Sequence, residues 1–119
     1  MKNGLSRVGA IESAGRQLQA QYGTEPIPHK QIVDAASRLG GFARSSIIPS
    51  DFCYNCLNRD PVSASMANAM FVRVGLGMYE FLGSGYAYSG EVTWTPKGSH
   101  QRPVGMWING NYKAYASNP

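Results

Sequence analysis

The segment Ala43–Arg59, ARSSIIPSDFCYNCLNR, says most about how this chain folds. Pro49 followed by Ser50 is typical of a helix start, because a serine side chain caps free backbone N–H groups and proline is tolerated in the first turn. The sequence therefore predicts a short helix over residues 50–58. Its apolar side chains would share one face: Phe52, Cys53, Cys56 and Leu57.

The opposite face of this expected helix carries hydrogen-bonding groups: Asp51, Tyr54, Asn55 and Asn58. Asparagine can bond an adenine edge through its donor and its acceptor together, and tyrosine can stack on a base or contact a phosphate. The carboxylate of Asp51 would repel a nearby phosphate, so Asp51 either caps the helix or accepts a hydrogen bond from a cytosine amino group. The flanking candidate phosphate contacts are Arg44, Ser45, Ser46, Ser50 and Arg59. Base recognition is the favoured function of this face, and a merely solvated polar face is the alternative.

Two longer helices are expected before this segment. Over residues 5–22, apolar side chains recur at helical spacing and Gly23 is a suitable stop. A second helix is expected over residues 29–39, ending at Gly40-Gly41. Two helices with a short glycine-containing connection are typical of a helix-turn-helix.

The apolar period changes to two after residue 70. Residues 70–74 and 78–82 predict two strands that meet at Gly75-Leu76-Gly77, and the same pattern returns at 91–95, 104–108 and 111–115. Asn109-Gly110 between the last two is a strong hairpin signal. The order of elements predicts an α+β protein: a winged helix-turn-helix with an N-terminal helix and a C-terminal antiparallel β extension.

The length of 119 residues fits a single domain. Within it we expect an N-terminal helix at 1–23, a winged-helix core at 27–82, and a β-hairpin extension at 83–119.

Three motifs resemble sequences of a known family. Residues 28–36, PHKQIVDAA, resemble the first helix of HARE-HTH winged helices, and residues 70–81, MFVRVGLGMYEF, are similar to the wing of that family. Residues 48–55, IPSDFCYN, are similar to a segment of small winged-helix modules attached to bacterial restriction endonucleases. The resemblance departs at Pro28, where threonine is typical, and at Leu76, where a basic residue would contact phosphate. It implies DNA binding that senses sequence or base modification in a bacterial or phage conflict system.

The charge balance also favours nucleic acid. The net charge is +4 and the isoelectric point is near 9.3, so acidic partners are expected, with double-stranded DNA first. Further candidate contacts are Arg73 on the expected wing, and Lys97 and Arg102 in the loop over residues 96–103. An ordinary surface loop is the alternative interpretation of that last region.

Catalysis, metal binding and cofactor binding have little support in the sequence. Cys53 and Cys56 have metal or redox spacing, but zinc would need further ligands and only His29 and His100 are on offer. Redox chemistry of the thioredoxin type would need a strand-to-helix junction, so buried core is expected. The acids show no nuclease pattern. We therefore expect no catalytic residues, no metal, no cofactor and no enzyme.

The chain has no apolar run of about 18 residues, so no membrane span is expected. The first residues lack a signal-peptide stretch, and two cysteines suit a reducing setting, so a cytoplasmic location is expected.

The C-terminal part is rich in aromatic residues: Tyr86, Tyr88, Trp94, Trp107, Tyr112 and Tyr115. Such residues build strand cores, and they also stack on splayed bases or form protein interfaces. A protein-interaction module, either an inhibitor or an adaptor, is therefore the alternative function. The sequence does not indicate an oligomeric state.

Overall fold

A computed structural model describes residues 6–57, 68–94 and 101–115. The helical elements are α1 (Arg7–Tyr22), α2 (His29–Gly40) and two single 3-10 turns, η1 (Arg44–Ser46) and η2 (Pro49–Phe52). The strands are β1 (Ile27–Pro28), β2 (Cys56–Leu57), β3 (Phe71–Gly75), β4 (Met78–Phe81), β5 (Gly90–Trp94), β6 (Arg102–Ile108) and β7 (Asn111–Ala114). The α+β class predicted from the sequence is confirmed.

The two long helices form where the apolar pattern predicted them. Ser6 caps α1 by accepting a hydrogen bond from the Gly9 N–H at 3.0 Å, and Gly41 ends α2 in a left-handed conformation at φ 74°. The helices pack against each other, and Ile11 of α1 and Ile32 of α2 are fully buried in the same cluster.

A three-stranded antiparallel sheet lies beside the helices, in the order β1-β4-β3. β3 and β4 form the hairpin expected around Gly75-Leu76-Gly77, with a register shift between Arg73 and Gly75. β1 pairs with β4, so the short strand between the two helices joins the hairpin to the helical part.

The C-terminal strands form a second sheet in the order β2-β5-β6-β7. β5, β6 and β7 are antiparallel neighbours, and the expected Asn109-Gly110 turn joins the last two. β2 pairs with β5 in parallel, so this sheet takes a strand from before residue 83.

The helix expected over residues 50–58 is wrong. Only Pro49–Phe52 makes a helical turn, Cys53 is extended at φ −105° and ψ 147°, and Cys56 and Leu57 are a strand. The physical reason is tertiary. The Tyr54 N–H donates to the Phe71 carbonyl at 2.7 Å, and the Thr93 N–H donates to the Asn55 carbonyl at 3.1 Å. Bonds to two sheets outweigh the weak helix preference of cysteine, tyrosine and asparagine.

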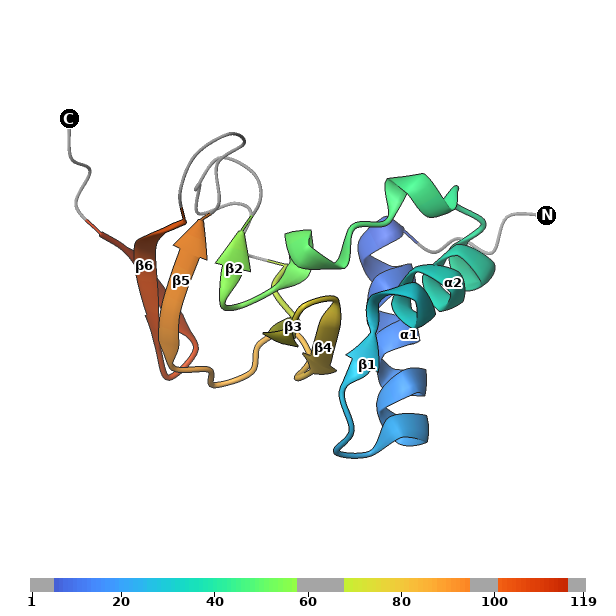
Figure 1. Cartoon of the computed structure of the whole chain (residues 1–119), viewed down its shortest axis with the longest axis horizontal. Helices are drawn as coiled ribbons and strands as arrows, with labels where there is room; N and C mark the ends of the chain where they lie inside the picture. Colours follow the sequence, from blue (N-terminus) through green and yellow to red (C-terminus); the bar gives the residue numbers. More distant parts are fainter. Residues whose placement is uncertain (1–5, 58–67, 95–100, 116–119) are drawn as a thin grey trace.

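The helices occupy one end of the molecule and the four-stranded sheet the other, with the three-stranded sheet between them (Figure 1). The molecule is elongated, with extents of 48 × 27 × 25 Å. The described residues form two buried clusters: one around the helices and β3–β4, and a second around Tyr54, Ala69, Val92 and Trp107. None of the helices in the described ranges is long and apolar enough to cross a membrane.

Candidate functional site

The two sheets meet along the segment 53–57, which we call the seam. At its start, Cys53 forms a parallel bridge with Phe71 of β3. At its end, Cys56 and Leu57 pair with β5. The segment expected to read DNA as a helix therefore connects the two sheets as a non-helical segment that bends at Tyr54 and Asn55.

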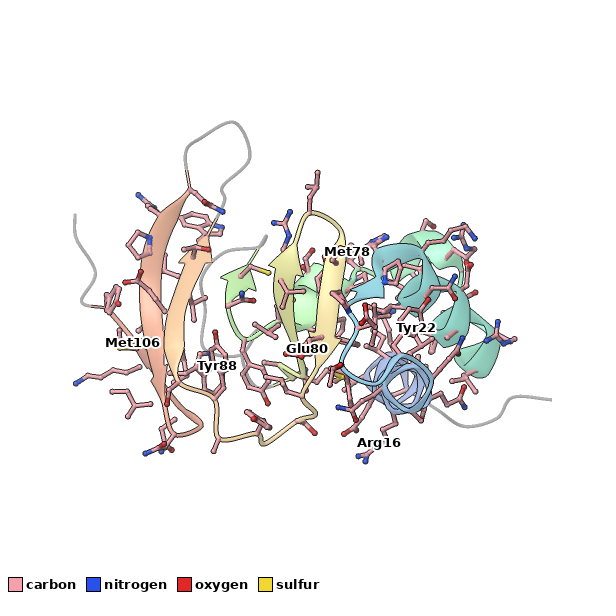
Figure 2. The ribbon with its side chains drawn as sticks, turned by 60° about the horizontal axis from the view of Figure 1, so that its bottom comes forward. Arg16, Tyr22, Met78, Glu80, Tyr88 and Met106 are labelled. Carbon is pink, nitrogen blue, oxygen red and sulfur yellow. The ribbon has the colours of Figure 1, made fainter. Side chains whose placement is uncertain are left out.

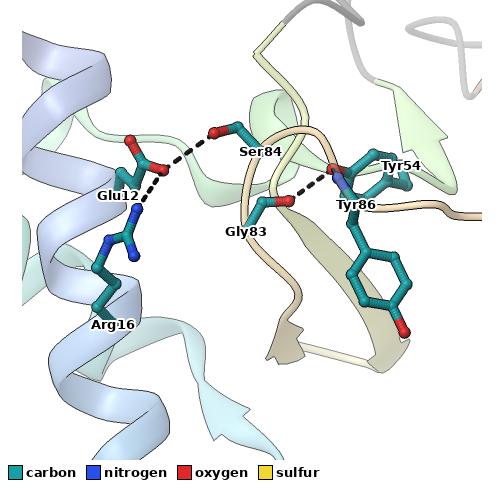
Figure 3. Close-up of polar contacts among 6 residues, drawn as sticks. All are labelled: Glu12, Arg16, Tyr54, Gly83, Ser84 and Tyr86. Carbon is teal, nitrogen blue, oxygen red and sulfur yellow. Dashed lines mark hydrogen bonds and ion pairs between the residues drawn. The ribbon is translucent and has the colours of Figure 1, made fainter. Parts of the chain in front are cut away.

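Tyr54 points into the core at the seam, with 1% of its surface exposed. Its hydroxyl donates to the Gly83 carbonyl at 2.6 Å and accepts from the Tyr86 N–H at 3.1 Å (Figure 3). Its ring stacks on Tyr88 at 5.1 Å and meets Trp107 edge-on at 5.0 Å. Burial raises the pKa of the Tyr54 phenol. The expectation of an exposed Tyr54 that contacts DNA is corrected, because the aromatic strands cover it.

The side-chain amide of Asn55 makes hydrogen bonds within the fold. Its amide nitrogen donates to the Arg73 carbonyl at 2.9 Å, and its carbonyl accepts from the Arg73 N–H at 2.9 Å. This is the donor-and-acceptor pattern expected for an adenine edge, directed instead at the edge of β3. The expected base-reading role of Asn55 would require both bonds to break.

An open groove of about 280 Å³ lies between the two sheets beside the seam. Its lining includes Asn55, Cys56, Arg73, Leu76, Thr93 and Gln101. Among the described residues that line it there is an arginine and no carboxylate. The Arg73 Nε also donates to the Gly75 carbonyl at 3.2 Å, which holds the guanidinium near the β3–β4 turn.

The sequence-predicted residues around Arg44 lie elsewhere. Arg44 pairs with Asp34 of α2 at 2.7 Å, and Lys30 reaches the same carboxylate at 2.8 Å. Hydrogen bonds from Lys30 and then Arg44 lower the pKa of Asp34. Ser45 is exposed, and the Ser46 hydroxyl donates to the Ala43 carbonyl at 2.8 Å. None of these lines the groove.

The remaining candidates divide between the four-stranded sheet and the undescribed residues. Arg102 begins β6, and its guanidinium lies over the Trp94 ring at 4.8 Å. Ser50 lies within η2 and is half-buried, with a hydrogen bond to the Tyr79 phenol. Asn58, Arg59 and Lys97 lie outside the described residues.

The cysteine prediction is confirmed for one residue. Cys53 is buried in the first cluster with 2% exposed, whereas Cys56 is half-buried and lines the groove. Within the described ranges, no group of three or more metal-ligating side chains gathers.

Sequence reasoning missed Thr93 as a groove residue, whereas Gln101 belongs to the loop over residues 96–103, a candidate phosphate contact in the sequence. Thr93 belongs to no motif, and it comes to lie beside Cys56 because β2 pairs in parallel with β5. Nothing local in the sequence signals that pairing.

Comparisons with known proteins place the chain in a family. Residues 11–114 match the model of a domain of unknown function, DUF7225. The chain is also similar to the uncharacterized protein YnaC of Bacillus subtilis (strain 168), with 28% identity over 111 residues. That alignment covers 92% of this chain and 34% of the relative, so the chain spans about a third of that protein. No solved structure matches. The chain belongs to the DUF7225 family, whose function has not been assigned.

Proposed function

We propose that the protein binds duplex DNA as a winged-helix module, with the groove beside the seam and the β3–β4 hairpin as its contact surface. The order of two helices followed by a hairpin supports this, as does a three-stranded sheet in which β1 pairs with the second hairpin strand. The place of a third helix is taken by the turns η1 and η2 and the seam. The hairpin is the wing of this proposal.

The observation that carries the proposal is the position of Arg73. Arg73 lines a groove whose described lining holds no carboxylate, so a phosphate there would meet the positive charge of Arg73, with Asp51 the opposing charge that reaches the neighbouring Cys56. Gln101 adds an exposed amide and Thr93 a half-buried hydroxyl. The Gln101 amide can donate a hydrogen bond to phosphate or to a base edge, whereas the Thr93 hydroxyl donates to the Asn55 carbonyl at 3.4 Å and can accept one.

Arg102 extends the proposed surface, and Arg44 is a separate candidate contact beside α2. Arg102 directly follows Gln101, and stacking on Trp94 limits the conformations of its side chain. Arg44 is 56% exposed although it pairs with Asp34, and such a surface pair exchanges readily for a phosphate contact. The proposal also includes discrimination of sequence or base modification in a bacterial or phage conflict system. The family resemblance of residues 27–82 supports this part.

The test is binding of a labelled duplex, unmodified or methylated, measured by fluorescence anisotropy over a salt series. Arg73→Ala should weaken binding and lower the slope of log affinity against log salt by about 1, because one phosphate contact is lost. Arg16→Ala is the matched control. It removes the same charge from α1, on the side of the molecule away from the β3–β4 turn (Figure 2).

Two results would contradict the proposal. One is no binding to either duplex at low salt. The other is an equal loss for Arg73→Ala and Arg16→Ala, which would mean that only net charge matters.

A second candidate function is binding of a protein partner through the hairpin tip. Leu76 is 91% exposed and Val74 is 50% exposed, at the position where a DNA-binding wing would present a basic residue. A photo-crosslinking amino acid at position 76 distinguishes the two functions. A nuclease-resistant adduct that Val74→Ser diminishes supports a protein partner, and a nuclease-sensitive adduct supports DNA.

A further inference from the structure

The two cysteines of the seam form an asymmetric pair. Cys53 faces the first core cluster with 2% of its surface exposed, and its thiol lies 3.6 Å from the Pro49 carbonyl oxygen. Cys56 lies three residues on, past the bend at Tyr54 and Asn55, and lines the groove. Both thiols are free, and Cys56 packs against the core cluster that contains Cys53.

The surroundings of the two sulfurs differ in a way that matters for reactivity. The hydrogen bond from Cys53 and the charge of Arg73 lower the pKa of Cys56, against opposing effects of burial and of Asp51. The same contact with Cys56, followed by burial, raises the pKa of Cys53. Cys56 is therefore the better thiolate and is also the sulfur that faces the groove, while Cys53 is a protonated thiol behind it.

We propose that Cys53 and Cys56 are a reversible oxidation site, at which a peroxide entering the groove oxidises Cys56 and Cys53 then closes an intramolecular disulfide. The proposal concerns a modification of the protein and does not depend on what the groove binds.

The chemistry balances in two steps. The Cys56 thiolate sulfur attacks one peroxide oxygen, the O–O bond breaks, and the leaving hydroxide takes up a proton to become water. The product is a sulfenic acid at Cys56. The Cys53 sulfur then attacks the Cys56 sulfur, the S–O bond breaks, and the departing hydroxide leaves as water with the proton of Cys53. Two thiols and one hydrogen peroxide give one disulfide and two waters, and a dithiol reductant reverses the oxidation.

The position of the pair gives the disulfide a structural effect. Cys53 bridges to Phe71 in the three-stranded sheet, and Cys56 pairs with Thr93 in the four-stranded sheet. A bond between them closes a small ring around Tyr54 and Asn55. Oxidation would therefore act on the junction of the two sheets.

The test uses the folded wild-type chain with a stoichiometric amount of hydrogen peroxide. Intact mass should fall by two hydrogens, both thiols should disappear together, and peptide mapping should join Cys53 to Cys56. A dithiol should restore the original mass. In a separate measurement at neutral pH, iodoacetamide should label Cys56 at least about tenfold faster than Cys53, because thiolate character and access coincide there.

Variants separate the two roles. Cys53→Ser should leave a sulfenic acid at Cys56 that dimedone traps, whereas Cys56→Ser should remove the rapid reaction with peroxide. The proposal is overturned if wild-type protein gives only disulfides between chains. It is equally overturned if Cys53 is labelled first, or if Cys56 reacts with peroxide no faster in the folded chain than in the urea-unfolded chain. The wild-type measurements decide the matter even if the buried Cys53→Ser variant fails to fold.

Discussion

The side-chain amide of Asn55 pairs with the backbone of Arg73 through two hydrogen bonds of 2.9 Å each, in the manner of a neighbouring β-strand residue. Arg73 is thereby fixed at the edge of β3, in the groove that we propose as the DNA contact. Asn55 thus joins the seam to the β3–β4 hairpin, and this role is structural.

Asn55→Ala should destabilise the fold by about 1–3 kcal/mol, because it leaves the Arg73 N–H and carbonyl without their partner in a half-buried place. Urea unfolding followed by circular dichroism measures this. Asn111→Ala is the control, since Asn111 is exposed and makes a single long bond of 3.4 Å to the Ile108 carbonyl. If both variants lose the same stability, the double bond to Arg73 does not support the fold.

Tyr54→Phe keeps the buried ring and removes only the hydroxyl. It should cost about 1–3 kcal/mol, because the Gly83 carbonyl and the Tyr86 N–H both lose their partner in the covered second cluster. Chemical denaturation of the two proteins gives the difference. Tyr86→Phe, on a ring that is 48% exposed, should change stability by much less. Wild-type stability for Tyr54→Phe would show that water satisfies the two backbone groups.

The raised pKa of Tyr79 predicts a loss of stability at alkaline pH. Burial, helped by the nearby cysteines, raises its pKa to about 12 from an unfolded value of 10.0. Between those two pH values the unfolded chain loses the phenolic proton while the folded chain keeps it, so the free energy of unfolding falls as pH rises. The loss should reach about 2–3 kcal/mol near pH 12.

Denaturation midpoints measured over the experimental range from about pH 9 to about pH 12 check this. Tyr79→Phe should make the decline shallower, because one of the groups with a raised pKa is gone. The exposed Tyr86→Phe variant should keep the full decline. A Tyr79→Phe profile as steep as that of the wild type would assign the alkaline loss to another group.

Gly15 is expected to resist substitution although it lies inside α1. A Cβ added there would overlap the ring of Phe81 in β4. Gly15→Ala should therefore destabilise the fold, since overpacking costs about 1–3 kcal/mol. The better helix propensity of alanine returns only about 1 kcal/mol. Gly15→Ala combined with Phe81→Leu should recover part of the loss in thermal unfolding. Additive losses would mean that Phe81 is not the obstacle.

Some of this molecule follows from local patterns in the sequence. The helical spacing of Val8, Ile11 and Leu18, with Gly23 after them, placed α1 within two residues of its observed start. Asn109-Gly110 placed the β6–β7 turn, because that pair adopts the positive φ values the turn needs, here 50° and 83°. Such features depend on side chains a few residues apart, so a single sequence contains them.

The candidate site does not follow in this way. Pro49 and Ser50 gave a helix-start signal, and the chain followed it for one turn only. From Cys53 onward the backbone pairs with β3 on one side and with β5 on the other. Phe71 lies 18 positions after Cys53, and Thr93 lies more than 35 positions after Cys56. Whether Tyr54 and Asn55 face solvent or the core was therefore settled by which strands came to lie beside them. The amino-acid sequence alone places hydrogen-bonding side chains in the seam. Which groups they bond to depends on the tertiary structure, because backbone pairing with two sheets is more stabilising than the weak local preference for a helix.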